Sequence, residues 1–472
     1  ALLGGALGLL LAVWGLDALV SFNPDDLPRL TEVRLNAPAL WFNLGAVAVT
    51  GLLFGLLPAW QVARGQVNQT LRDGGRGVFG QAHGQRLRGA LVIAEVALSL
   101  IVLTGAGLLL KSFHRLLNVE TGFKAENLLT VNLPLVEIKD SARRVNTVRD
   151  VLARVAQVPG VVAASGGSAL PPVNAQRGTR FAVEGLPAIS DNNAYFIAVS
   201  PDYFHALGTP LREGREFTAR DDDRAAKTVI INQFMARKLF PNESALGKRV
   251  QLINSEQANE WREVVGVAAD VRYSGLDDAL TMTIYTPFAQ TPFVWSYLMI
   301  RTAGPPAALT ASVRQAIKAA DPALDPASFR PLTELVSESV AQPRFYTFLF
   351  GAFGVLALVL AAVGIYGVLA YTVAQQTREI GVRLALGAGR GAILRLVLRQ
   401  GMWLTLTGVT IGLTGAWAMT RLLKTLLFEV SATDPLTFAA IACLLVGVAL
   451  LACWLPARRA TKVDPIIALR CE

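Results

Sequence analysis

Residues 347–373 read TFLFGAFGVLALVLAAVGIYGVLAYTV, and none of these 27 side chains is charged. A helix of about 20 mostly apolar residues crosses the hydrocarbon core of a bilayer, so this stretch predicts a membrane span. Five further apolar stretches lie at 1–20, 39–59, 90–110, 402–423 and 436–455. Six such stretches are too many for the buried core helices of a soluble protein. We therefore expect an α-helical membrane protein with six transmembrane helices.

The composition agrees with a membrane protein. Hydrophobic residues make up 53% and charged residues 17% of the 472 residues, whereas soluble domains have about 25% charged residues. The cysteines Cys443, Cys453 and Cys471 form no CxxC pair and have no histidine nearby, so we expect neither a zinc site nor a disulfide framework. The net charge of +9 does not indicate nucleic-acid binding, because the basic residues cluster beside the apolar stretches.

The distribution of arginine predicts the orientation in the membrane. Segment 60–89 holds five arginines and one aspartate, and segment 374–401 holds five arginines and one glutamate. Loops rich in Lys and Arg stay in the cytoplasm, so both segments are expected on that side. The polar segment 111–346 then lies outside the cytoplasm.

Segment 111–346 contains a strand-helix-strand pattern twice. The predicted elements are strand 127–135, helix 141–157 and strand 161–168, then strand 296–302, helix 307–320 and a strand around 327–332. Two such units separated by an insertion predict a split ferredoxin-like lobe. The insertion, about 175–293, is expected to be a second lobe with β-like runs at 227–232, 262–271 and 282–288 and a helix around 232–240. The fold class is therefore a helical membrane protein with an α+β extracytoplasmic domain.

Residues that suggest catalysis are few. His205 lies in the apolar and aromatic run SPDYFHALG, which predicts packing or a surface position. The acidic run Asp221–Asp223 suits either a cation or a solvated turn, and the turn is favoured. No GxSxG, HExxH or GxxxxGK[ST] motif occurs, so we expect no enzyme, no cofactor and no metal site, and ATP hydrolysis only in a separate polypeptide.

The cytoplasmic segment 376–401, QTREIGVRLALGAGRGAILRLVLRQG, carries the sharpest signal. A short amphipathic helix is expected at 378–386, Gly387 to Gly389 end it, and a second amphipathic helix leads into the next span. From the residues alone, the short helix either docks in a groove of another protein or lies on the membrane surface against anionic lipid.

One ionisable residue lies well inside a predicted span. Glu95 is about two turns into the stretch 90–110, where a carboxylate is costly and is a functional candidate. Its expected partners are Arg88, a hydrogen bond from another helix, or water at the membrane interface.

A partial repeat links the two ends of the chain. LPAWQVARGQVNQTLR at 57–72 and LPARRATKVDPIIALR at 455–470 share five identical positions, and each ends a two-span hairpin. Residues 1–75 are thus interpreted as the last two spans of a first copy whose beginning is missing. Residues 86–472 would be a complete second copy.

REIGVRLALGA at 378–388, DPLTF at 434–438 and the segment 455–470 together resemble the FtsX/MacB-type permease family of ABC transporters. VSPDYFHALGTPLREGREFT at 199–218 and VVGVAADVRYSGL at 264–276 are similar to the periplasmic core domain of such permeases. The resemblance implies a cytoplasmic linker at 76–89, a span at 90–110, a periplasmic core domain at 111–346 and a three-span permease domain at 347–472. It also implies a coupling helix that contacts a cytosolic ABC ATPase through Arg378, Glu379, Ile380, Gly381, Arg383, Leu384, Gly387 and Ala388.

The resemblance further implies a bacterial inner-membrane protein of the mechanotransmission type. Closure of the ATPase would move the extracytoplasmic domain and so drive export or extraction of a substrate. A periplasmic adaptor and membrane lipid are expected partners. The alternative is a sensor or a regulator of an extracytoplasmic hydrolase, and a channel is disfavoured because the spans hold few ionisable residues.

Overall fold

Long apolar helices dominate the first of two units of the chain, Ala1–Arg115 with Pro343–Glu472, and the second unit is Leu116–Gln342. The computed structural model describes residues 2–22, 36–64, 79–173, 178–187, 192–253, 260–326, 328–386 and 389–461.

Every predicted span is helical. The helices of the first unit are α1 (Leu2–Phe22), α2 (Ala37–Arg64), α4 (Phe79–Leu117), α10 (Ala341–Gln375), α11 (Thr377–Ala385), α12 (Arg390–Met419), the 3-10 helix η3 (Thr420–Leu426) and α13 (Pro435–Ala460). Within the described residues, four apolar helical segments are long enough to cross a membrane, namely Arg88–Leu117, Ala341–Gln375, Arg390–Leu426 and Pro435–Ala460. The described apolar parts of α1 and α2 are shorter, at Leu2–Gly15 and Ala37–Leu52.

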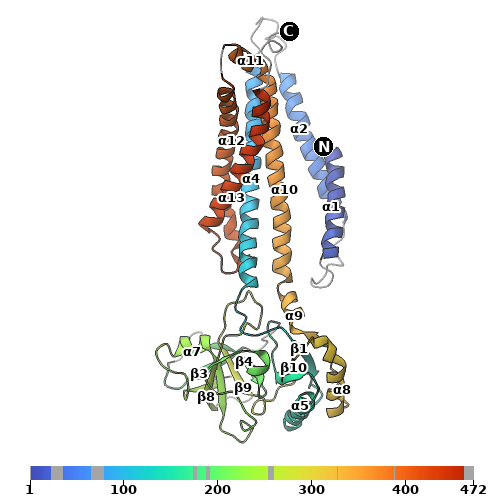
Figure 1. Cartoon of the computed structure of the whole chain (residues 1–472), viewed down its shortest axis with the longest axis vertical. Helices are drawn as coiled ribbons and strands as arrows, with labels where there is room; N and C mark the ends of the chain where they lie inside the picture. The colour runs from blue at the N-terminus through green and yellow to red at the C-terminus, as the bar shows by residue number, and fades with distance from the viewer. Residues whose placement is uncertain are drawn as a thin grey trace. The chain divides into compact units, whose positions relative to one another are not determined.

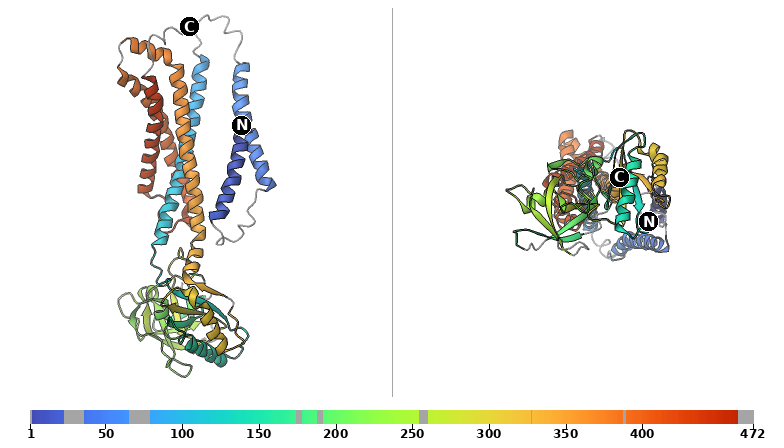
Figure 2. Two further views of the ribbon diagram at one scale, coloured as in Figure 1. Left: turned by 45° about the vertical axis from the view of Figure 1, so that its right-hand side comes forward. Right: turned by 90° about the horizontal axis from the view of Figure 1, so that it is seen from below.

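The four long helices α4, α10, α12 and α13 lie side by side (Figure 1, Figure 2). Glycines of α12 let it approach α4 closely. A Cβ at Gly408 would lie 2.8 Å from Cβ of Val96, and one at Gly412 would lie 2.9 Å from the carbonyl oxygen of Ala97. Small residues at this spacing are the usual means of close helix packing in lipid, where burial of apolar surface does not drive association.

The second unit is an α+β domain. Its strands are β1 (Leu128–Pro134), β2 (Val161–Gly167), β3 (Gly178–Val183), β4 (Asn193–Val199), β5 (Leu211–Gly214), β6 (Thr228–Asn232), β7 (Arg249–Ile253), β8 (Trp261–Ala268), β9 (Thr283–Pro287), β10 (Trp295–Thr302) and β11 (Phe329–Pro331). Its helices are α5 (Ser141–Val155), α6 (Tyr203–Leu207), α7 (Gln233–Leu239), the 3-10 helix η2 (Pro306–Leu309), α8 (Thr310–Ala320) and α9 (Leu332–Ser339).

Four strands in the order β11-β1-β10-β2 form the part of the sheet that α5 and α8 accompany. All three pairings are antiparallel. The apolar stripe of α5 explains its orientation, because Val148 and Val151 are buried in the same core cluster as Val313 and Ile317 of α8 and Leu298 of β10. The Asp140 carboxylate begins α5 by accepting a hydrogen bond from the amide of Ala142.

The inserted strands close on themselves. From β4 the pairing runs through β3, β7, β8, β6 and β9, and β9 pairs in parallel with β4 again. The second core cluster takes side chains from all six strands, including Phe181, Ala194, Ile231, Val250 and Ile284. These strands therefore form a small closed barrel filled by its own side chains.

The local predictions for this domain are confirmed. Predicted strand 127–135 is β1, helix 141–157 is α5, and runs 227–232 and 282–288 are β6 and β9. Residues 307–320 differ slightly, because the helix starts with the 3-10 turn η2 before α8. The closure of the barrel depends on β4 pairing with β9, which are distant in sequence, and local patterns do not predict such pairings.

Candidate functional site

The short helix α11 lies at one end of the four-helix bundle, between α10 and α12 (Figure 1). One face of α11 is part of the bundle core. Ile380 is 1% exposed and belongs to the core cluster, Leu384 packs against that cluster, and Gly381 is buried. The apolar side of the helix thus attaches it to the bundle core.

The opposite face of α11 is open to the surroundings. Glu379, Val382, Arg383 and Leu386 follow the spacing of three and four residues that puts them on one side of a helix. Arg383 Nη2 lies 2.5 Å from Glu379 Oε1, and Leu386 is 83% exposed. This face therefore presents an exposed ion pair and an exposed leucine.

The residues that the resemblance assigned to the coupling helix fall into an exposed group and a buried group. Glu379 and Arg383 are exposed, whereas Ile380, Gly381 and Leu384 face the bundle. The Arg378 side chain, Gly387 and Ala388 lie outside the described residues. Val382 and Leu386 are exposed residues that the sequence reasoning missed, although their helical spacing from Glu379 was a readable signal.

A groove of about 870 Å³ opens beside the exposed face of α11. Glu379 and Arg383 line one wall, and Arg399 and Trp403 of α12 line another. The groove therefore combines charged groups with a large apolar surface.

Glu95 and Arg88 are not paired. The Arg88 guanidinium lies 3.9 Å from the centre of the Tyr371 ring, so the pairing with Arg88, one of the alternatives for Glu95, does not form. The Glu95 carboxylate packs over Gly364 of α10, where a Cβ would lie 2.0 Å from Oε2. Among the described residues Glu95 forms no hydrogen bond or ion pair, and a small residue at position 364 is what makes room for it.

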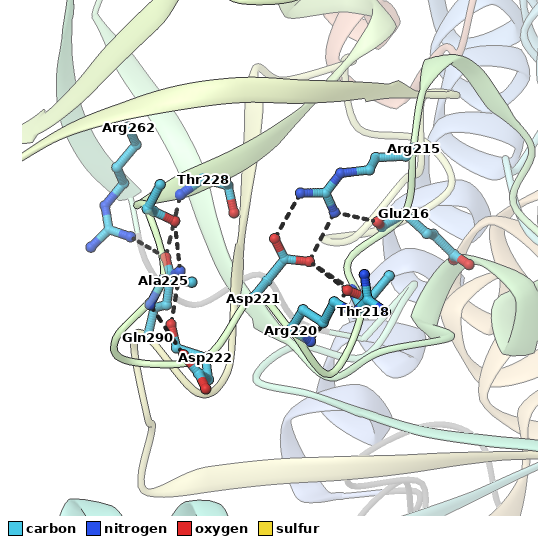
Figure 3. A network of polar contacts seen from close by, with 11 residues as sticks. Arg215, Glu216, Thr218, Arg220, Asp221, Asp222, Ala225, Thr228, Arg262 and Gln290 are labelled. Carbon is cyan, nitrogen blue, oxygen red and sulfur yellow. Dashed lines mark hydrogen bonds and ion pairs between the residues drawn. The ribbon is translucent and has the colours of Figure 1, made fainter.

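The acidic run in the α+β domain is a fixed turn (Figure 3). The Arg215 guanidinium donates to both Asp221 carboxylate oxygens at 2.8 Å, and the Thr218 amide donates to Oδ2. The hydrogen bond from Arg215 lowers the pKa of Asp221 below its ordinary value of 3.8. Asp222 accepts from the amides of Arg224 and Ala225. Within the described part of the chain, no group of His, Cys, Asp or Glu is arranged to hold a metal ion.

His205 lies on α6 and is exposed. Its backbone amide donates to Glu216 Oε1 at 3.0 Å. The surface position is one of the two that the sequence predicted.

Two protein-family models match the chain. One, described as FtsX-like permease C-terminal, matches residues 351–465 and so includes α11. The other, described as MacB-like periplasmic core domain, matches residues 89–320. Neither matched region is a nucleotide-binding domain.

Several curated proteins are similar to this chain. A "Macrolide export ATP-binding/permease protein MacB" of Chromobacterium violaceum is 28% identical over 291 residues, which are 60% of this chain and 44% of the relative. A "Pyoverdine export ATP-binding/permease protein PvdT" of Pseudomonas aeruginosa is 27% identical over 59% of this chain and 42% of the relative. The chain therefore spans less than half the length of these relatives.

Among solved structures, the periplasmic region of MacB from Actinobacillus actinomycetemcomitans aligns with a TM-score of 0.33 and 15% identity. That alignment covers 47% of this chain and 95% of the solved one.

Proposed function

Because the chain belongs to the FtsX-like permeases that carry a MacB-like periplasmic core domain, we propose that it is the membrane component of an ABC export system. An ATPase subunit binds the exposed face of α11 on the cytoplasmic side. ATP is hydrolysed in that separate subunit, since the sequence holds no P-loop motif. The names of the curated relatives, which export macrolides and pyoverdine, suggest a substrate that leaves the cell.

The contrast between the buried and the exposed face of α11 carries this proposal. Ile380 anchors the helix in the bundle core, so a force applied to Glu379, Arg383 and Leu386 is transmitted to α10 and α12. The chain enters the α+β domain from α4 and leaves it into α10. Movement of these two helices is therefore the route by which the ATPase moves the periplasmic domain.

The same family membership supports the remaining domain organisation. We assign α1 and α2 as two further spans, which gives six in total, and residues 1–75 as the end of a first permease copy. Residues 76–89 are the cytoplasmic linker, 90–110 a span, 111–346 the periplasmic domain and 347–472 the three-span permease domain. The four-strand order with two helices supports a split ferredoxin-like lobe, and the barrel is the inserted lobe. The protein belongs in the bacterial inner membrane, and a periplasmic adaptor is a further expected partner.

The test is co-purification of the full chain from its native membrane in mild detergent, followed by mass spectrometry and an ATPase assay. Glu379→Arg and Leu386→Glu should each remove the ATPase subunit, because they change only the exposed face of α11. Lys424→Glu is the matched control, since it changes the charge as strongly at an exposed position of η3. Equal retention of the ATPase by all variants would reject α11 as its binding site, and a chain that never retains an ATPase would favour the sensor or regulator.

A further inference from the structure

We propose that the groove beside α11 binds one anionic phospholipid, with the phosphate at Arg399 and Arg383 and an acyl chain along Trp403. The inference requires only that the four long helices cross a membrane. It does not depend on which ATPase or substrate the protein serves.

The charges at the mouth of the groove select an anion. Arg383 is already paired with Glu379 at 2.5 Å. Arg399 forms no ion pair or hydrogen bond with any residue in the described ranges, and it is exposed. One positive charge is therefore left over, and a phosphate placed between the two guanidinium groups neutralises it. The side chains of Gln376 and Gln400, which also line the groove, offer amide donors for the headgroup.

The deeper wall of the groove is apolar. Trp403 is 72% exposed, and Leu404 and Leu406 line the groove beyond it. Leu406 lies seven residues after Arg399 on α12, which is about 10 Å along a helix. The groove therefore runs from a charged mouth into the apolar part of a membrane-spanning helix, and this polarity matches a phospholipid.

The position of the apolar wall within a membrane-spanning segment disfavours a soluble protein as the occupant of the groove. A cytosolic subunit meets α11 from the water side, whereas the wall at Leu404 and Leu406 lies within the apolar segment Arg390–Leu426. The volume of about 870 Å³ is within the range of ligand sites. Basic pockets of this kind between membrane helices bind lipid headgroups.

Native mass spectrometry of the full chain tests the proposal. The protein is purified in detergent and exposed to equal amounts of phosphatidylglycerol and phosphatidylcholine with the same acyl chains. We expect the wild type to retain phosphatidylglycerol about fivefold better, the effect of one basic side chain near an anionic headgroup. Arg399→Gln should bring that ratio to about one, and Trp403→Ala should remove one bound lipid of either kind.

Arg395→Gln is the control, because Arg395 is also exposed on α12 but does not line the groove. Loss of selectivity in this control would show diffuse surface charge and overturn the proposal, as would equal retention of both lipids by the wild type. Glycerol 3-phosphate in excess should leave the lipid bound; displacement would make the site a phosphate site and reject the lipid. If Arg399→Gln released a co-purifying ATPase with unchanged lipid selectivity, the groove would be a protein site instead.

Discussion

The Lys111 ammonium lies 2.6 Å from Asp434 Oδ2, which joins α4 to the first residue before α13 across 323 positions of sequence. The same carboxylate caps α13, because it accepts hydrogen bonds from the amide and the hydroxyl of Thr437. The hydrogen bond from Lys111 lowers the pKa of Asp434 to about 2. One side chain thus fixes two helices of the bundle at the end opposite α11.

The two roles of Asp434 can be separated by mutation. Asp434→Asn keeps a good helix cap and removes the ion pair, so it should cost about as much as Lys111→Met, roughly 0.5 kcal/mol. Asp434→Ala also removes the cap and should cost about 1 kcal/mol more. Thermal unfolding of the detergent-solubilised chain measures all three. Equal losses for Asn and Ala would show that the cap does not stabilise α13.

Glycine in α12 is required where it faces α4. Gly412→Ala places a Cβ 2.9 Å from the Ala97 carbonyl oxygen, and we expect a loss of about 1 to 3 kcal/mol from overpacking. Gly447→Ala in α13 is the control, because a Cβ there meets nothing within 4 Å. The control should be neutral or gain up to about 1 kcal/mol through helix propensity. Fluorescence-detected thermal unfolding distinguishes the two, and a control that loses as much as Gly412→Ala would contradict the packing argument.

Asp221 makes the α+β domain sensitive to acid. Its carboxylate is 6% exposed and paired with Arg215, which lowers its pKa below 3.8 in the folded state. The stabilisation is therefore present above about pH 3.8 and is lost as the pH falls through the lower folded-state pKa. Asp221→Asn should lower the free energy of unfolding at pH 7 by about 1 to 2 kcal/mol. The loss should be smaller at pH 3. Asp223→Asn, at an exposed carboxylate, should show neither effect, and a deficit that persists unchanged at pH 3 would contradict the assignment.

Arg262 is a buried cation with few partners. It is 0% exposed, its Nη1 donates to Gln290 Oε1 at 3.3 Å, and its Nη2 lies 3.9 Å from Glu260 Oε2 (Figure 3 shows the Gln290 contact). Its Nε and Nη2 form no hydrogen bond with any residue that the structure describes. Burial lowers the pKa of the guanidinium. Replacing such a group with an apolar side chain of similar length, Arg262→Met, should be neutral or stabilising by about 1 kcal/mol.

Gln290→Ala supplies the contrast at the same site. It leaves Arg262 without its hydrogen bond, and also removes the donors to the carbonyl oxygens of Asp222 and Ala226. We expect a loss of about 2 to 3 kcal/mol. Urea unfolding of the full chain in detergent compares the two variants, and a strong loss in Arg262→Met would mean that the ion pair with Glu260 outweighs the cost of burying the guanidinium.

Local patterns in the sequence determined the helices and most of the strands. Apolar stretches of about 20 residues predict helices because a helix satisfies every backbone hydrogen bond within the segment itself, as the bilayer core requires. The valine spacing of 141–157 matches the buried face of α5, because that spacing is a property of the helix alone. The arginine-rich segment around α11 was also readable as a candidate site from its sequence.

The tertiary structure decided everything that depends on residues far apart in the chain. Helical spacing groups Leu386 with Glu379, but only the neighbouring helices decide that Ile380 is buried in the bundle core while Leu386 remains exposed. The sequence also did not indicate that β9 closes the barrel on β4, or that Arg88 contacts Tyr371 instead of Glu95. Such pairings depend on how whole helices and strands pack together. Sequence patterns report only the preferences of neighbouring residues, so they do not predict these pairings.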